Sequence, residues 1–155
     1  MKEFILIYND NKIPSIKQIY DFNCDVEIKT VDDVLLLMKN IYSLDILESE
    51  RAYLIGFDDN NYLIGCYCIS IGDYNSTIIN DRTIATVSLL IGAKSVLVLH
   101  NHPNDNLIST IDDMIVNSKT EKVIDIIGLN YIGGYVVSKF GWKKIGSSSM
   151  HEWRI

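Results

Sequence analysis

The sequence contains little proline and little cysteine, and both shortages narrow the class of protein. The chain has only two prolines in 155 residues, and 48% of its residues are hydrophobic. This composition speaks against extensive disorder. The three cysteines are an odd number and lack the spacing of a disulfide framework. We therefore expect one globular domain that is large enough to bury a core and whose cysteines are reduced.

Clusters of basic residues and long hydrophobic runs are also lacking. The net charge is −6, and Lys143-Lys144 is the one basic pair that stands out, whereas nucleic-acid binders need clustered Lys and Arg. No apolar run approaches the length of a membrane span, and residues 1–8 are too short and too acidic for a secretory signal. We therefore expect a cytoplasmic protein without a nucleic-acid or membrane partner.

Apolar stretches of strand and helix type alternate along the chain. They predict strands over residues 4–8, 52–57, 62–71, 96–99 and 135–138, and helices over residues 30–44, 82–91 and 110–127. Thr30, with Asp33 three residues later, is the expected cap of the first helix, and Asp81 is the expected cap of the second. Gly92 and Gly128 are the expected stops of the last two helices. Residues 13–23 are expected to be irregular or partly helical, and residues 72–76 a loop. Because strands and helices interleave, we predict an α/β or α+β fold with helices flanking a mixed sheet.

The two ends of the chain and the paired cysteines fit no obvious chemistry. Residues 1–29 read as a strand with an irregular extension, and residues 146–155 as a linker or frayed end in which His151 is solvated. Cys66 and Cys68 share one face of a strand-like run. We interpret them as core thiols, with a second metal site as the alternative.

Two histidines follow the most apolar of the predicted strands. His100 and His102 are spaced i, i+2, so their imidazoles lie on one face, and Pro103 then ends the strand because it has no N–H to donate. Two neutral imidazoles side by side suit a zinc ion, and Asp113 is our candidate for a third ligand. A zinc site of this kind keeps a fourth position for water when it is catalytic.

Each of these residues also has a purely structural interpretation. Half-buried histidines often bond to carbonyl groups instead of a metal. Thr110 and Asp113 form a Thr-x-x-Asp pattern that resembles a capping box, with Asp in place of the usual Glu or Gln. Capping and metal binding are compatible, because residues three apart at a helix start are neighbours.

Together these residues resemble the motif of the JAB/MPN (JAMM) metallohydrolases, specifically their RadC-like branch. The family motif is a glutamate on an early strand, then His-x-His, seven residues, Ser, two residues and Asp. His100-Asn101-His102 is followed by seven residues, Thr110, two residues and Asp113, and the branch's His-Asn-His-Pro is also present. Glu50 falls where the family places its catalytic glutamate. The resemblance runs from about residue 30 to residue 138.

The resemblance implies a zinc-dependent metallohydrolase in which His100, His102 and Asp113 hold Zn²⁺ and a water molecule. Zinc lowers the pKa of such a water toward about 7. Glu50 would pass the proton of the water to a leaving amine, and Thr110 would donate to the oxyanion. The implied substrate is a peptide or protein cleaved at a peptide or isopeptide bond. Without the resemblance, Glu50 would read as an exposed carboxylate at a strand start.

The resemblance also implies that residues 30–145 adopt the JAB/MPN fold, which is cytidine deaminase-like. Departures from the motif keep other functions open: Thr110 replaces its Ser, Asn104-Asp105 replaces the branch's usual Ser-Gly, and Gly133-Gly134 replaces a late Asp-His pair. One alternative is a non-catalytic MPN-type scaffold that binds a protein partner. Another is a DNA-repair-associated accessory protein, suggested only by the historical label of RadC-like proteins. The sequence carries no signal for the oligomeric state.

Overall fold

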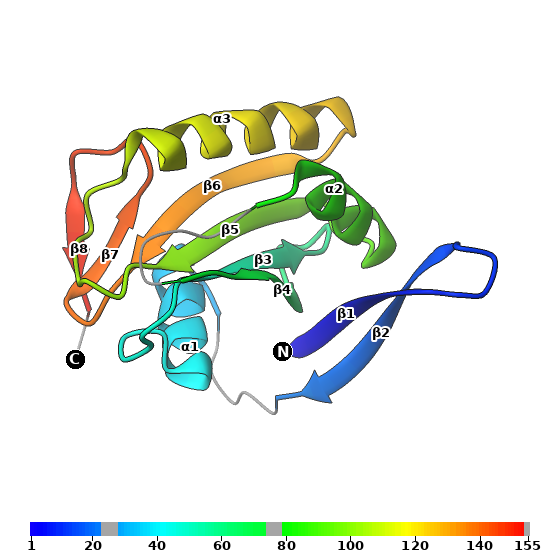
Figure 1. The fold of residues 1–155 in the computed structure, drawn as a ribbon, viewed down its shortest axis with the longest axis horizontal. Coiled ribbons are helices and arrows are strands. Elements are labelled where there is room, and N and C mark those ends of the chain that lie inside the picture. Colours follow the sequence, from blue (N-terminus) through cyan, green and yellow to red (C-terminus); the bar gives the residue numbers. More distant parts are fainter. Residues whose placement is uncertain (23–27, 74–78, 154–155) are drawn as a thin grey trace.

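A computed structural model describes residues 1–22, 28–73 and 79–153 of the chain. Within these residues, eight strands form one sheet in the order β2-β1-β4-β3-β5-β6-β7-β8 (Figure 1). The strands are β1 (Lys2–Tyr8), β2 (Pro14–Asp21), β3 (Arg51–Phe57), β4 (Leu63–Ile71), β5 (Ser95–Asn101), β6 (Asn130–Val137), β7 (Gly141–Lys144) and β8 (Met150–Glu152). The pairs β1–β4 and β5–β6 are parallel and the other neighbours are antiparallel, so the sheet is mixed as predicted.

Helices cover both faces of this sheet. Helix α1 (Val31–Tyr42) lies on one face, whereas α2 (Asp81–Leu90) and α3 (Ile111–Ile126) lie on the other (Figure 1). The predicted arrangement of helices around a mixed sheet is therefore confirmed at this level. None of the helices in the described ranges has the length and apolar character needed to cross a membrane.

The central strand β5 is buried along its whole length and divides the core in two. Leu97 and Leu99 belong to the apolar cluster that includes residues of α1. Val96 and Val98 point the other way, into the cluster that includes residues of α2 and α3. The same alternation places His100 on the side of α2 and α3, at the end of a buried strand.

Two of the helices begin with the same capping box. Thr30 with Asp33 opens α1, and Thr110 with Asp113 opens α3. In each box the threonine oxygen accepts the aspartate N–H, and the aspartate carboxylate accepts the threonine N–H. The structure confirms both capping boxes predicted from the sequence.

The structure differs from the prediction before α1 and before α2. Residues 14–21 are not irregular or helical but form the edge strand β2, whose side chains are mostly exposed and therefore show no clear apolar alternation. Helix α2 is capped by Asn80, whose Oδ1 accepts the N–H of Thr83 at 3.1 Å, and not by Asp81. Cys24 and most of the predicted loop 72–76 lie outside the described residues.

The C-terminal segment is also part of the sheet. Residues 150–152 form β8, which pairs with β7, where the sequence suggested a linker or frayed end. His151 is exposed, but it also stacks on Trp142 with the ring centroids 4.0 Å apart. The indole N–H of Trp153 donates to the carbonyl oxygen of Ser138 at 2.8 Å. These contacts between distant aromatic and polar groups have no signature in the local sequence.

Candidate metal centre

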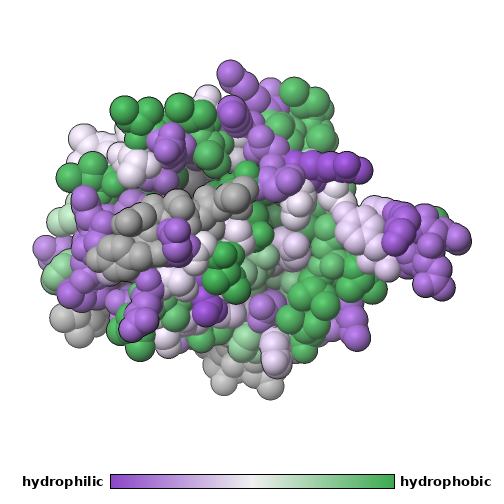
Figure 2. Space-filling model, in the orientation of Figure 1, coloured by the Kyte–Doolittle hydropathy of each residue, from purple (hydrophilic) through white to green (hydrophobic). Residues whose placement is uncertain are grey.

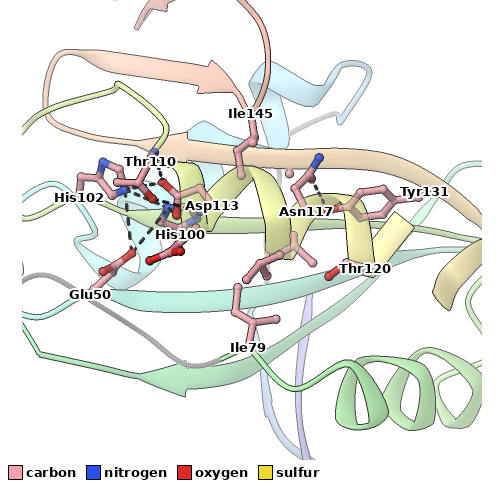
Figure 3. Close-up of a pocket in the computed structure, with 14 residues that line it drawn as sticks. Glu50, Ile79, His100, His102, Thr110, Asp113, Asn117, Thr120, Tyr131 and Ile145 are labelled. Atoms are coloured by element: carbon pink, nitrogen blue, oxygen red, sulfur yellow. Dashed lines mark hydrogen bonds and ion pairs between the residues drawn. The ribbon is translucent and has the colours of Figure 1, made fainter. Parts of the chain in front are cut away.

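The predicted site residues come from three elements that meet at the carboxyl end of β5. His100 lies in β5 and His102 just beyond it, Asp113 lies in the first turn of α3, and Glu50 precedes β3 (Figure 3). Strands β3 and β5 pair antiparallel with Ala52 opposite His100, so the start of β3 runs beside the histidines. The fold therefore brings Glu50, which is distant in the sequence, next to the histidines and Asp113.

The distances within this group fit a tetrahedral metal ion. One ligand atom from each of the four residues lies within 4.8 Å of all the others. The Nε2 atoms of His100 and His102 are 3.0 Å apart, and they lie 3.3 Å and 3.6 Å from the two carboxylate oxygens of Asp113. Ligands at about 2.0–2.1 Å from a tetrahedral zinc ion are about 3.3 Å from one another. The separation of the two imidazole nitrogens and the distance from each to its nearer Asp113 oxygen lie close to this value, so the three side chains are within reach of one such ion.

The imidazole of His102 is oriented by a backbone group. Its Nδ1 lies 2.5 Å from the carbonyl oxygen of Asn106, so Nδ1 carries the hydrogen and donates it. The lone pair of Nε2 then points into the group of ligand atoms, as in metal-binding histidines. The structural interpretation of a histidine bonded to a carbonyl thus holds for His102 without excluding metal binding. Nδ1 of His100 is buried and has no hydrogen-bond partner within the described residues.

The charges around these ligands favour the forms that bind metals. Burial alone would raise the pKa of the Asp113 carboxyl, but the hydrogen bond and charge of His100, together with hydrogen bonds from Thr110, hold it below its usual range. Burial lowers the pKa of His102, and the neighbouring His100 lowers it further. Near neutral pH, Asp113 is therefore an anion and His102 is neutral.

Glu50 is buried, and the alternative of an exposed carboxylate at a strand start is therefore wrong. Its side chain is 7% exposed, with Oε1 3.6 Å from Nε2 of His100 and 4.0 Å from Nε2 of His102. Burial raises the pKa of Glu50 against the lowering charge of His100, and the carboxylates of Asp113 and Asp73 raise it further. The site thus holds two carboxyl groups whose pKa values move in opposite directions.

The sequence analysis did not recognise the role of Asn101, which lies between the two histidines. Its side chain is fully buried, and Oδ1 accepts the backbone N–H of Arg51 at 2.8 Å while Nδ2 donates to the carbonyl of Ser49 at 3.2 Å. These two hydrogen bonds hold the residues on either side of Glu50. The sequence does contain a signal for this role. Because side chains alternate along a strand, Asn101 lies on the face opposite to the histidines, and a polar side chain that is buried there needs hydrogen-bond partners.

A cavity of about 200 Å³ adjoins the ligand group (Figure 3). Thr110 lines it near the histidines, and Gly134 of β6 lines it further along. At its far end, the hydroxyl of Tyr131 donates to Oδ1 of Asn117 at 2.8 Å. The sequence analysis predicted neither the cavity nor this hydrogen bond, because the lining residues come from separate elements whose packing is not encoded locally.

Comparison with known proteins points to one family. Residues 28–152 match the family model of the RadC-like JAB domain. A UPF0758 protein of Finegoldia magna is 32% identical over 89 residues, which cover 57% of this chain and 40% of that protein. A UPF0758 protein of Clostridium novyi is 26% identical over 110 residues (71% of this chain, 47% of that protein), and one of Thermotoga maritima is 22% identical over 112 residues (72% and 50%).

The chain therefore covers between 40% and 50% of the length of these three relatives. The family model covers most of the chain and includes Glu50, both histidines and Asp113. From this match we conclude that the chain belongs to the RadC-like JAB domain family.

Proposed function

We propose that this chain is a zinc-dependent metallohydrolase that cleaves amide bonds of the peptide or isopeptide type, and that its sheet and helices are those of the JAB/MPN (cytidine deaminase-like) fold. One observation carries the proposal: the ligand atoms of two imidazoles and a carboxylate lie close enough together to bind one metal ion, and the buried carboxyl of Glu50 lies beside them. Membership of the RadC-like JAB domain family supports it.

His100, His102 and Asp113 would hold the zinc ion. Two nitrogen ligands and one oxygen ligand favour zinc over magnesium or calcium, which prefer oxygen ligands. Three protein ligands leave one position of a tetrahedral site open, as in other catalytic zinc sites. A bound zinc ion would supply Lewis-acid chemistry, which lowers the pKa of water and polarises a carbonyl group.

Glu50 would carry the proton of the reaction. The oxygen of one water molecule bonds to the carbonyl carbon, and a proton of that water passes through the Glu50 carboxylate to the amide nitrogen. The C–N bond then breaks and releases a carboxylic acid and an amine. The raised pKa of Glu50 suits a group that both accepts and donates a proton, a role worth about 10²–10⁴ in rate.

Thr110 would stabilise the negative charge that develops on the carbonyl oxygen. Its side chain lines the cavity next to the ligand group, and its oxygen is held in place by the N–H of Asp113 at 3.0 Å. Because this oxygen is fixed, rotation about the C–O bond can turn the single hydroxyl hydrogen from the Asp113 carboxylate toward an oxyanion. The threonine keeps the hydroxyl of the family's serine and adds a methyl group.

The test combines metal analysis with a screen of peptide and isopeptide substrates. We expect the purified wild-type chain to contain about one zinc ion and to hydrolyse at least one substrate of the screen. Glu50→Gln should keep the zinc and lose at least about 10²-fold in turnover, because the amide cannot accept the proton. His100→Ala and Asp113→Ala should lose the zinc, because each removes a ligand.

The outcomes separate the enzyme from the alternatives. A wild-type chain that binds no transition metal, or a Glu50→Gln variant that hydrolyses substrate at the wild-type rate, would contradict the proposed mechanism. Bound zinc without turnover of any substrate would favour the protein-binding scaffold. Binding to DNA at low salt, where electrostatic affinity is greatest, would favour the accessory role in DNA repair.

A further inference from the structure

We propose that the cavity beside the metal centre binds the side chain of a branched aliphatic or aromatic residue, namely the residue that supplies the scissile carbonyl. This inference rests on the proposed function and adds the class of substrate. The cavity measures about 200 Å³ including the space at the candidate ligands, and a buried apolar cavity of about 150 Å³ is large enough to bind benzene. Its size therefore matches a side chain such as leucine or phenylalanine.

Away from the candidate metal ligands, four aliphatic side chains line the cavity. Val98 lines it from β5, Ile79 from the segment before α2, Val116 from α3, and Ile145 from the position after β7. At the far end, Tyr131 donates its hydroxyl hydrogen to Oδ1 of Asn117 at 2.8 Å, and Thr120 donates its own to Oδ1 of Asp81 at 3.4 Å, so both hydroxyl hydrogens have partners within the protein. An apolar side chain that enters the cavity gains contacts and leaves water, whereas a charged one loses its hydration.

A glycine keeps the cavity open. A Cβ atom at Gly134 would lie 2.4 Å from Oδ1 of Asn117 and 2.8 Å from Cδ1 of Ile145. Any larger residue at position 134 would push these two side chains or fill the space between them. The absence of a side chain at position 134 therefore preserves the space of the cavity, and the local sequence does not indicate this role.

The position of the cavity assigns it to the carbonyl side of the substrate. In Figure 3 Glu50 lies on one side of the ligand group, and Asn117, Thr120 and Tyr131 lie beyond its opposite side. The leaving nitrogen must lie near Glu50, which protonates it, so the acyl part of the substrate extends away from Glu50. Val116 lies one turn of α3 beyond Asp113, or about 5 Å along the helix axis. If the scissile carbonyl of the substrate lies at the metal centre, the side chain on the adjacent substrate Cα can reach this far.

The carboxylates near the mouth select against acidic residues. Glu50, Asp112 and Asp113 all line the cavity, and no lysine or arginine belongs to the lining within the described residues. A substrate carboxylate in this place would face like charges and would lose water without gaining a partner. We therefore expect discrimination against aspartate as well as a preference for apolar side chains.

The test measures binding of peptide-like hydroxamates to the zinc-loaded full chain by isothermal titration calorimetry. The probes are the N-acetyl hydroxamates of glycine, leucine, phenylalanine and aspartate, which differ only in the side chain next to the zinc-binding group. Each buried CH₂ contributes about fourfold in affinity. We expect leucine or phenylalanine to bind at least about tenfold more tightly than glycine, and aspartate to bind no more tightly than glycine.

Two variants that fill the cavity from different walls should remove this preference. In Val116→Phe and in Ile145→Phe, the ratio of leucine to glycine affinity should fall below about threefold. Ser118→Phe is the matched control, because Ser118 is exposed on the same helix and does not line the cavity; it should keep the wild-type ratio.

The outcomes distinguish the two proposals. If the chain binds no zinc, or zinc-loaded protein binds none of the hydroxamates, the proposed function fails and this inference fails with it. If all four probes bind with equal affinity to the zinc-loaded wild type, the metal centre stands and the assignment of the cavity is overturned. A preference that persists in both cavity-filling variants would also overturn it.

Discussion

At the scale of single residues, the site depends on side chains that serve two purposes at once. Asp113 closes the capping box of α3 with one carboxylate oxygen and faces the histidines with both. His102 donates from Nδ1 to a backbone carbonyl and leaves Nε2 for a metal. Local structure and candidate chemistry therefore share the same atoms, so the confirmed capping box at Thr110 and Asp113 is compatible with the proposed role of these residues at a metal.

The two identical capping boxes allow the structural and catalytic effects of Thr110 to be separated. Thr30→Ala and Thr110→Ala should each lower the free energy of unfolding by about 1 kcal/mol, because each removes an N-cap side chain. Turnover should fall in Thr110→Ala alone, and Thr110→Ser should restore it. Denaturant unfolding and the peptidase assay measure the two effects. Equal turnover in both alanine variants would refute a role for Thr110 in the reaction.

At the scale of elements, the order of the strands decides where Glu50 lies. Strand β3 pairs with both β4 and β5, so the first strand of the β3–β4 hairpin lies next to the strand that carries His100. Asn101 extends this pairing beyond the ladder through its bonds to the backbone of Arg51 and Ser49. The position of Glu50 is therefore set by strand pairing and by one buried amide.

We expect Asn101→Ala to lower both stability and turnover but to leave metal binding unchanged. The variant leaves a backbone N–H and a carbonyl without partners, which should cost about 2 kcal/mol in the free energy of unfolding. It should also reduce turnover, because Glu50 is no longer held, while zinc content stays near one because the three ligands are untouched. Asn60→Ala, in an exposed turn, is the control and should change stability by less than about 0.5 kcal/mol. Wild-type turnover in Asn101→Ala would argue against this positioning role.

At the scale of the whole molecule, the face of the sheet that α3 covers carries both the polar site and exposed apolar side chains. Hydrophobic side chains gather over α3 in Figure 2, and Ile111, Met114 and Ile115 of this helix are exposed. Only Thr120 and Ile124 of α3 are buried, so the helix presents much of its apolar surface to solvent and to the cavity. An apolar surface beside a polar site is typical of a protein that binds a peptide or protein partner.

Zinc binding should stabilise the whole fold, because its ligands join β5 to α3. At a zinc concentration about 100 times the dissociation constant, the gain is about 2.7 kcal/mol. For a chain of this size, this gain raises Tm by about 5–10 °C in a thermal-unfolding experiment. A chelator should reverse the shift, and Asp113→Ala should show none. A wild-type Tm that does not respond to zinc would mean that the folded chain does not bind the ion.

The sequence by itself determined the local features: the buried histidine strand, both capping boxes, the spacing of the ligands and the family that this spacing resembles. These features follow from alternation, helix capping and motif spacing, which act over a few residues. Tertiary structure decided the burial of Glu50, the bonds of Asn101, the edge strands β2 and β8, and the cavity beside Gly134. Each of these depends on contacts between elements distant in the chain, whose relative placement no local pattern specifies.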